Sequence, residues 1–447
     1  MTGASTQSSE MGNDAPAFLS RWEADRWLPG YQQCTAYFMQ TDDEGQVIAT
    51  FVRKNPQTLL PDAQWRRFAR TVLRRSPAAI LYVHGWNDHF YRRHASEFWE
   101  KMGVHFYAVD LPKFGRSYRS GQTPGYTEDL HGYFPVLDAL RDLIVKECGP
   151  RVKILAIGHS MGGLVASLWM HHRQPHHVTA LMLNSPWLEL QLTRFGRWLT
   201  TPVVRGVTMM GGKTAMPLND PGFYSRTLYK SQGGLWNYER YQLPDDVQFQ
   251  PRAGWMNAIY NGQDEVAKGL DIRVPVLVCT SDRSMLQTRW DPLMARADTV
   301  LDVQSVRQAA VNLGPFVTLV TIPGALHDIS MSAPDARREY FRIGLEWAGL
   351  LAWGSYRVSS RAEKAALDAV CAADGNEGWA TSDSETSEAA NPNQPSDNDD
   401  ENNAGDSDTL NHSDDVTQGI GVKSESDTSN YNNHKSIENS SQMQDNT

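Results

Sequence analysis

The chain has 447 residues, of which 40% are hydrophobic and 14 are tryptophan, enough for a large globular core with further segments. Charge is uneven: residues 374–447 hold 17 acidic residues against two lysines, so this segment carries −15 and the remainder +5. Neither part has a basic stripe interleaved with aromatic residues, which argues against nucleic-acid binding. The cysteines form no CxxC pair and predict neither a disulfide framework nor a zinc site.

Both ends of the chain differ in composition from its middle. Residues 1–16 are rich in serine, threonine and glycine, and we expect them to be flexible. They contain no signal-peptide core, and no apolar run along the chain is long enough to span a bilayer. We therefore predict a cytoplasmic protein with no integral membrane segment. Residues 372–447 have few apolar side chains, which predicts a disordered acidic tail.

The predicted elements begin with a hairpin, in which residues 36–40 and 46–53 alternate apolar and polar side chains around a turn. Short apolar runs then alternate with segments of helical periodicity. The expected strands are 78–83, 104–109, 151–157 and 178–183, and the expected helices are 91–102, 128–148 and 160–172. This alternation predicts an α/β fold with a mostly parallel, doubly wound sheet, whose strand C-termini share one edge where ligands usually bind.

The alternation stops between residues 187 and 270. This stretch is rich in Trp, Tyr, Phe and Met, and we interpret it as a cap inserted over the sheet edge. Most of its aromatic side chains should form the cap's own core, while some should line a cleft for an apolar acyl or aryl group. The sheet pattern then resumes with a strand at 274–280, a helix at 303–313, a strand at 316–322 and a helix at 336–353. The expected domains are a flexible N-terminus (1–16), a core in two parts (17–186 and 271–354), the cap (187–270) and the tail (372–447).

Residues 158–162 read Gly-His-Ser-Met-Gly, between a predicted strand and a predicted helix. On such a strand-to-helix corner the serine hydroxyl stands above the sheet edge, and glycines are needed because Cβ atoms would collide with the neighbouring strand and helix. Ser160 is therefore the predicted nucleophile. The alternative, that Ser160 merely caps the helix, leaves the glycines and a downstream histidine unexplained.

A serine hydroxyl becomes nucleophilic only when a base accepts its proton and a third group orients that base. His327 follows the last predicted strand and fits the chain order serine, carboxylate, histidine. The carboxylate should lie after strand 274–280. Spacing alone favours Asp282, although its closeness to the strand leaves little reach across the sheet edge. Further candidates are Asp291, Asp298 and Asp302.

The oxyanion of a tetrahedral intermediate needs backbone N–H donors that are already in place. One is expected from Met161, the residue after the nucleophile. The other is expected from Trp86, which follows His84-Gly85 at the end of strand 78–83. Gly85 permits the backbone to turn its amides inward. The alternative interpretation of His84-Gly85 is an ordinary tight turn.

These residues resemble the α/β-hydrolase family, and within it the branch of monoacylglycerol lipases, lysophospholipases and serine aminopeptidase-like enzymes. The resemblance covers roughly residues 30–354. It rests on His84-Gly85-Trp86, on residues 158–163, on His327, and on residues 110–117 (DLPKFGRS), which match that branch's D-x-x-G-x-G-x-S except at Lys113. The resemblance implies an α/β-hydrolase fold, a cap at 187–270, and no metal or organic cofactor.

The resemblance also changes the expected acid. The acid motif of that branch reads A-D-x-hydrophobic-x-D before a helix, and residues 297–302 (ADTVLD) match it. It therefore implies Asp298 as the third member of the triad, with Asp282 as the alternative. Residues 282–296 would then be an insertion between the strand and the acid.

The predicted function is a serine hydrolase that cleaves carboxylic esters through an acyl-enzyme on Ser160. The expected small-molecule substrate is a lipophilic ester such as a monoacylglycerol or lysophospholipid. One alternative is amide or peptide hydrolysis, for which the cap offers carboxylates without a recognisable motif: Glu189, Glu239, Asp245, Asp246 and Asp264. Another is a ligand-binding protein without turnover. Epoxide hydrolysis is disfavoured because it needs an aspartate nucleophile. The tail is expected to aid solubility or to recruit a basic partner, and the oligomeric state is left open.

Overall fold

The computed structural model describes residues 15–56, 77–189, 194–216, 221–237, 249–354 and 360–373. The predicted acidic tail beyond residue 373 and most of the predicted flexible N-terminus lie outside these residues. Three of the cap carboxylates named above, Glu239, Asp245 and Asp246, also lie outside them. No helix in the part of the chain that is described is both long and apolar enough to cross a membrane.

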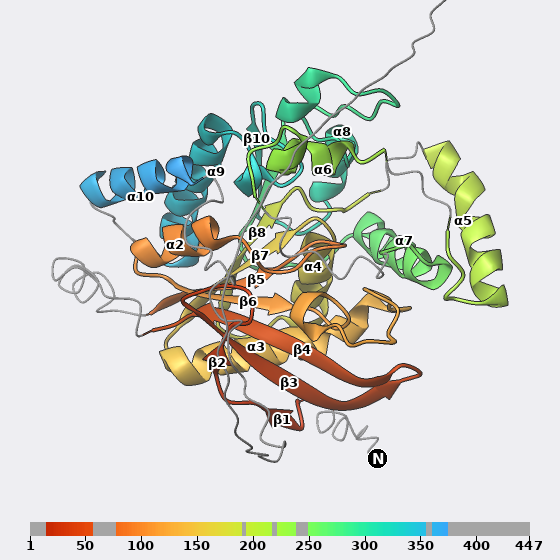
Figure 1. Ribbon diagram of the computed structural model, residues 1–447, viewed down its shortest axis with the longest axis horizontal. Helices are drawn as coiled ribbons and strands as arrows, with labels where there is room; N and C mark the ends of the chain where they lie inside the picture. Colours follow the sequence, from red (N-terminus) through yellow and green to blue (C-terminus); the bar gives the residue numbers. More distant parts are fainter. Residues whose placement is uncertain are drawn as a thin grey trace, which may run out of the picture. The chain divides into compact units, whose positions relative to one another are not determined.

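One twisted sheet of ten strands forms the centre of the fold (Figure 1). Its order is β1-β3-β4-β6-β5-β7-β8-β9-β10, and β2 pairs with β3. The first four strands are antiparallel, and the six from β5 to β10 are parallel to one another. The strands are β1 (Phe18–Leu19), β2 (Glu23–Ala24), β3 (Tyr31–Asp42), β4 (Gly45–Lys54), β5 (Ala78–Val83), β6 (His105–Asp110), β7 (Lys153–His159), β8 (Val178–Asn184), β9 (Val276–Ser281) and β10 (Val317–Ile322). The predicted α/β fold with a mostly parallel sheet is confirmed.

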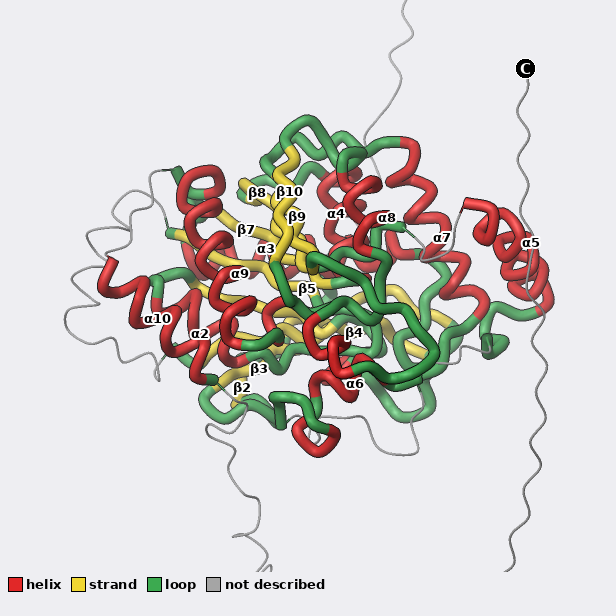
Figure 2. Tube along the Cα trace, turned by 90° about the horizontal axis from the view of Figure 1, so that it is seen from above, coloured by secondary structure: helices red, strands yellow, loops and turns green. Residues whose placement is uncertain are grey.

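Helices cover both faces of the sheet, which is why its central strands are continuous apolar runs. In β5, Leu81 faces one buried cluster together with side chains of α3 and α4. Its neighbour Ile80 faces a second cluster with side chains of α2, α9 and α10. Figure 2 shows α2, α9 and α10 on one side of the strands and α4 on the other. The helices are α2 (Arg93–Lys101), α3 (Phe134–Cys148), α4 (Met161–Arg173), α5 (Arg194–Met210), α6 (Phe223–Leu228), α7 (Ala253–Lys268), α8 (Val303–Ala310), α9 (Pro334–Trp347) and α10 (Ser360–Ala372).

Two features of the C-terminal part differ from the predicted pattern. The helix predicted at 336–353 is α9 followed by a π-helical turn, Ala348–Ala352. The sequence pattern also did not predict α10, which is one short helix whose Leu367 and Val370 are buried against α2 and α9. Short helices are set by tertiary packing more than by their own propensity, so sequence periodicity identifies them poorly.

The segment predicted as a cap contains α5, α6 and α7. Its last helix, α7, packs against the core helix α4, and α5 packs against α7 (Figure 1). Between α6 and α7, Trp236 donates from its Nε1 atom to the Met331 carbonyl at 2.6 Å. Trp236 also belongs to a small buried cluster with Leu326. The segment is therefore joined to the loop that follows β10, next to the predicted base His327.

Glu100 is a buried carboxylate on α2 with an expected effect on stability. Its side chain is 7% exposed, Lys54 lies 3.8 Å from it, and burial raises its pKa to about 8. The folded protein therefore binds a proton that the unfolded chain has already lost, and stability falls as the pH rises toward 8. We expect Glu100→Gln to remove this pH-dependent loss of stability. The free energy of unfolding of the variant should then exceed that of wild type by about 1–3 kcal/mol between about pH 5 and pH 9.

Urea unfolding of both proteins across this pH range measures the difference. The matched control is Glu346→Gln on α9, whose side chain is 53% exposed. A stability difference between wild type and Glu100→Gln that does not change with pH would contradict the assignment of a raised pKa to Glu100.

Candidate active site

Ser160 stands alone between the end of β7 and the first residue of α4. Its φ of 52° and ψ of −119° place it in a backbone conformation that non-glycine residues rarely adopt. The two outer glycines of the motif make this corner possible. A Cβ atom on Gly158 would lie 2.6 Å from the Gly162 carbonyl oxygen, and one on Gly162 would lie 2.2 Å from the His84 carbonyl oxygen. The corner requires glycine at both positions.

The structure brings Ser160, His327 and Asp298 into one line of polar contacts. His327 Nε2 lies 3.0 Å from Ser160 Oγ, and His327 Nδ1 lies 3.0 Å from Asp298 Oδ2. All three side chains are buried, with Ser160 the most exposed at 8%. A carboxylate accepts hydrogen bonds only, so His327 donates from Nδ1 and presents the lone pair of Nε2 to the serine hydroxyl. This is the arrangement that general-base activation of a serine requires.

Asp298 is held by the backbone of its own loop. Its second oxygen, Oδ1, accepts hydrogen bonds from the N–H groups of Val300 and Leu301, both at 2.8 Å. The chain leaves β9, makes an excursion and returns, because Asp298 N donates to the Arg283 carbonyl and Met285 N donates to the Asp298 carbonyl. The expected insertion at 282–296 is this excursion. It carries the acid back beside the end of β9.

The other candidate carboxylates have different partners. Asp282 accepts a hydrogen bond from the Gly324 N–H at 2.8 Å and pairs with Arg283, and its side chain is 22% exposed. Asp291 accepts from the Leu293 N–H at the start of a 3-10 helix. Asp302 caps the N-terminus of α8. Asp282 thus supports the loop that leads to His327, whereas Asp298 contacts the imidazole itself.

The loop after β5 brings Gly85 and Trp86 to the nucleophile. A Cβ atom on Gly85 would lie 3.2 Å from the Ser160 Cβ atom, so the backbone passes very close to that side chain. His84 Nε2 accepts from the Leu111 N–H at 3.0 Å, and its Nδ1 therefore carries the proton that it donates to the Gly85 carbonyl at 2.7 Å. Burial lowers the pKa of His84, which favours this neutral form.

This contact fixes the peptide unit between Gly85 and Trp86. In a trans peptide the N–H points away from the preceding carbonyl, so the Trp86 N–H is directed away from His84. The Met161 N–H belongs to the first turn of α4, where helix amides have no intrahelical acceptor. That these two N–H groups bind the oxyanion stays a prediction from the sequence.

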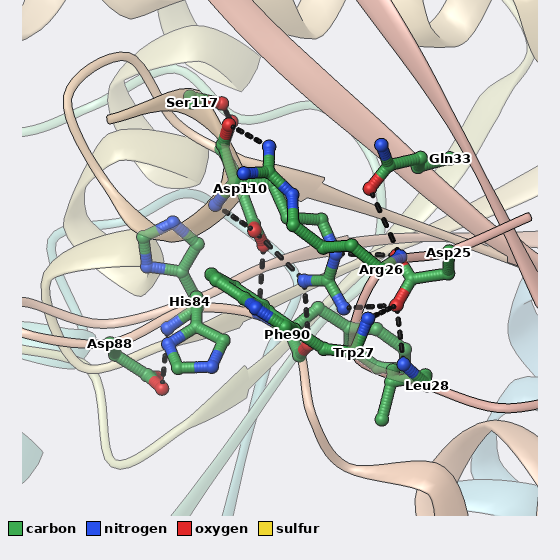
Figure 3. A network of polar contacts seen from close by, with 12 residues as sticks. Asp25, Arg26, Trp27, Leu28, Gln33, His84, Asp88, Phe90, Asp110 and Ser117 are labelled. Carbon is green, nitrogen blue, oxygen red and sulfur yellow. Dashed lines mark hydrogen bonds and ion pairs between the residues drawn. The ribbon is translucent and has the colours of Figure 1, made fainter. Parts of the chain in front are cut away.

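A buried ionic network contacts the loop after β5 (Figure 3). Asp110, at the end of β6, accepts from the Phe90 N–H and from the Arg116 guanidinium, and Arg116 also pairs with Asp25. Burial by itself would raise the pKa of Asp110, but the Arg116 charge holds it below its ordinary value. Asp110, Arg116 and Ser117 come from the segment that resembles D-x-x-G-x-G-x-S. The sequence analysis assigned these residues no role. The structure shows that they connect the loop after β5 to the loop after β6.

Comparison with known proteins identifies the family. Residues 74–332 match the family described as serine aminopeptidase, S33. The chain belongs to this family. It is therefore a hydrolase with the α/β-hydrolase fold, and the resemblance noted from its sequence is confirmed.

Individual relatives of this S33-family chain are distant. Phospholipase YtpA from Bacillus subtilis (strain 168) is 32% identical over 119 residues, which are 26% of this chain and 44% of that protein, so less than half of that relative is matched. A soluble variant of monoglyceride lipase from Saccharomyces cerevisiae is 13% identical, with a TM-score of 0.48 over 77% of this chain and 98% of that chain. A carboxyl esterase from Bacillus coagulans is 17% identical, with a TM-score of 0.47 over 73% and 100%.

The S33-family chain departs from its branch motif at Lys113, where a glycine is usual. Lys113 adopts a positive φ of 66°, which glycine reaches without strain. Its ammonium group lies 2.6 Å from Asp42 and 2.7 Å from Glu44, in the turn between β3 and β4. The lysine therefore keeps the backbone conformation of the motif and adds an ion pair between the hairpin and the loop after β6.

One set of supporting residues left no signal in the sequence. Asp328, next to His327, accepts from Arg92 Nε at 2.5 Å and from Asn184 Nδ2 at 2.7 Å. Burial would raise the pKa of Asp328, but the Arg92 guanidinium keeps it well below its ordinary range. Asp328 is therefore a buried anion that anchors the histidine loop to α2 and β8. These partners are far apart in sequence, so no local motif reveals them.

Aromatic rings lie around the nucleophile. Trp86 lies 4.8 Å from Trp255 of α7 and 5.8 Å from Phe249, measured between ring centroids. Trp187 packs against Trp255, and its backbone N–H donates to the Ser160 carbonyl at 3.0 Å. On the other side, the ring of Tyr224 stands edge-on to His327 at 5.4 Å. The predicted cap therefore contributes aromatic groups close to the triad.

Proposed function

We propose that this protein is a serine hydrolase that cleaves carboxylic esters through an acyl-enzyme on Ser160. The observation that carries the proposal is the pair of 3.0 Å contacts that joins Ser160 Oγ to His327 and His327 to Asp298. Ser160 Oγ attacks the ester carbonyl while His327 Nε2 accepts its proton. Asp298 holds the imidazole in the required tautomer and stabilises its charged form.

The attack forms a tetrahedral intermediate, which collapses when His327 returns the proton to the leaving alcohol. This step leaves the acyl group on Ser160. A water molecule then attacks the acyl carbonyl while His327 again accepts a proton. The bond between the acyl carbon and Ser160 Oγ breaks, His327 returns the proton to Oγ, and the acid is released. In both steps the negative oxygen is stabilised by the N–H groups of Trp86 and Met161, an effect worth about 3–4 kcal/mol per donor in comparable sites.

A variant at Gly85 tests the oxyanion assignment. An added Cβ atom would meet Ser160 Cβ and His159 Cδ2 at 3.2 Å, which displaces the loop that carries the Trp86 N–H. We expect Gly85→Ala to lower kcat roughly 10²-fold with little change in KM, because the donor acts on the transition state. Steady-state kinetics on a soluble ester measures both constants.

The matched control for this variant is Gly132→Ala. Gly132 has no atom within 4 Å of an added Cβ, so the same substitution there disturbs no contact. Wild-type kcat in Gly85→Ala would contradict a role for this loop in oxyanion binding. A raised KM with unchanged kcat would point to ground-state binding instead.

The substrate class that fits the surroundings of Ser160 is a lipophilic ester such as a monoacylglycerol or lysophospholipid. Trp86, Trp187 and Trp255 form an aromatic wall beside Ser160, and such rings favour an apolar acyl chain. Phospholipase YtpA, which matches 119 residues of this chain, supports the same substrate class by its name. The alternative, amide hydrolysis, agrees with the description of the matched family as serine aminopeptidase. Two of the five cap carboxylates, Glu189 and Asp264, lie within the described residues, and Asp264 pairs with Arg205 at 3.8 Å. We also propose a cytoplasmic location.

A substrate panel tests this function. We expect hydrolysis of p-nitrophenyl esters from acetate to palmitate, with an optimum above acetate. We expect p-nitroanilides of the same acyl groups to be cleaved far more slowly. One monoacylglycerol and one lysophosphatidylcholine then separate the two headgroup classes. Equal or faster cleavage of the anilides, or an optimum at acetate, would contradict the proposed substrate class.

A further inference from the structure

Two histidines and a glutamate meet at the opposite end of α4 from Ser160. His131 belongs to a 3-10 helix (Leu130–Tyr133), His172 lies in the last turn of α4, and Glu265 lies on α7. One nitrogen of each ring and a carboxylate oxygen all lie within 4.8 Å of one another. His131 Nε2 is 3.2 Å from Glu265 Oε1, and His172 Nε2 is 2.6 Å from Glu265 Oε2. Three elements that are separate in sequence thus direct ligand atoms to one point.

The contacts of His131 indicate which of its ring nitrogens can bind an ion. His131 Nδ1 lies 2.8 Å from Asp129 Oδ1, and a carboxylate accepts only, so Nδ1 carries the proton. The Nε2 atom of a neutral ring then presents a lone pair to Glu265. This atom is buried and, within the described residues, makes no hydrogen bond. A lone pair that faces a carboxylate oxygen is stabilised when a cation binds between them.

We propose that His131, His172 and Glu265 form a binding site for Zn²⁺. Two imidazoles and one carboxylate are a ligand set that suits zinc, with contacts of about 2.0–2.2 Å and water in the fourth position. The side chains of His131 and His172 are 38% and 40% exposed, which leaves room for that water. Asp129 has the place of the outer carboxylate that commonly orients a zinc-bound histidine. The 2.6 Å contact between His172 and Glu265 must lengthen by less than about 1 Å for tetrahedral coordination.

The ion would connect the predicted cap to the core. Glu265 is on α7, the last helix of the segment 187–270, whereas His131 and His172 belong to the core. α7 also packs against α4 and against the 3-10 helix that carries His131. Because the ligands lie at the far end of α4 from the nucleophile, the role of the metal is to hold α7 in place. It takes no part in the chemistry at Ser160.

The test is zinc titration of the full chain carrying Ser160→Ala, stripped with a chelator, by isothermal calorimetry and thermal unfolding. We expect one Zn²⁺ per chain, a melting temperature that rises with zinc concentration, and no response to Mg²⁺. Glu265→Gln and His172→Ala should each abolish this binding. Asp129→Asn should weaken it roughly 10–100-fold. The control His176→Ala removes an exposed histidine just beyond α4 and should bind as the parent does.

Two results would overturn the proposal. One is the absence of zinc binding in the parent protein. The other is equal binding in Glu265→Gln and His172→Ala, which would place the ion elsewhere, for instance on a cysteine. Because Ser160→Ala is the parent, neither result depends on the proposed esterase activity. Glu265→Gln also preserves side-chain size, so it separates loss of a ligand from loss of folding, which circular dichroism checks.

Discussion

Ser160→Ala is expected to reduce ester hydrolysis by about 10⁴-fold or more, to the level that binding and the oxyanion donors alone provide. The variant removes the atom that forms the acyl-enzyme, which is also the hydroxyl that lies 3.0 Å from His327 Nε2. The corner around Ser160 is built from backbone contacts and the two flanking glycines, so the fold should be retained. The measurement is the turnover rate on the best ester of the series.

A folded Ser160→Ala variant with substantial turnover would remove the serine mechanism from consideration. Unfolding curves establish that the variant is folded. A binding assay with a non-hydrolysable ester analogue separates the two remaining possibilities: retained binding with no turnover is expected here. The ligand-binding alternative is distinguished by the wild type, because it predicts binding without turnover of any ester.

Asp298→Asn is expected to lower kcat by about 10⁴-fold with a small effect on KM. The new amide side chain is nearly the same size as the carboxylate that it replaces, but its N–H₂ group would donate toward His327 Nδ1. The imidazole would then carry its proton on Nε2 and could not accept one from Ser160. The loss therefore arises from the wrong tautomer and not from a change of shape. Steady-state kinetics measures it.

Asp282→Asn is the matched control, with the same chemical change at the competing carboxylate. The amide oxygen of the new side chain can still accept from the Gly324 N–H, so the loop that leads to His327 is preserved. We expect turnover to stay within a few-fold of wild type. The reverse outcome, with Asp282→Asn inactive and Asp298→Asn nearly normal, would show that Asp282 orients the histidine.

The centre of the sheet could be predicted from the sequence because the strands from β5 to β9 are buried on both faces. The runs at 78–83 and 178–183 coincide closely with β5 and β8, and both are bounded by turns and polar residues. Helix α10 was not predicted because its stability derives from contacts with α2 and α9, which lie far away in the sequence. The path of residues 187–270 likewise depends on such contacts and could be predicted only as an insertion.

The three residues of the triad differ in how well local sequence patterns predict them. Ser160 directly follows β7 and His327 lies in the loop after β10, so their meeting at one sheet edge follows from parallel topology. Asp298 is separated from β9 by an excursion, and spacing alone favoured Asp282. Only the family motif at 297–302 pointed to the residue that contacts His327. The ionic network of Asp110, Arg116 and Asp25 was missed, because Asp25 lies far in sequence from the motif at 110–117 that contains the other two residues.

The central claim is that Ser160 forms a covalent acyl-enzyme, and labelling with a fluorophosphonate followed by intact-mass and peptide mass spectrometry tests it most directly. We predict one adduct per chain, located on the peptide that contains Ser160. The adduct should be absent from Ser160→Ala and should form much more slowly in Asp298→Asn. An adduct on another residue, or none on folded wild-type protein that binds the probe, would contradict the account.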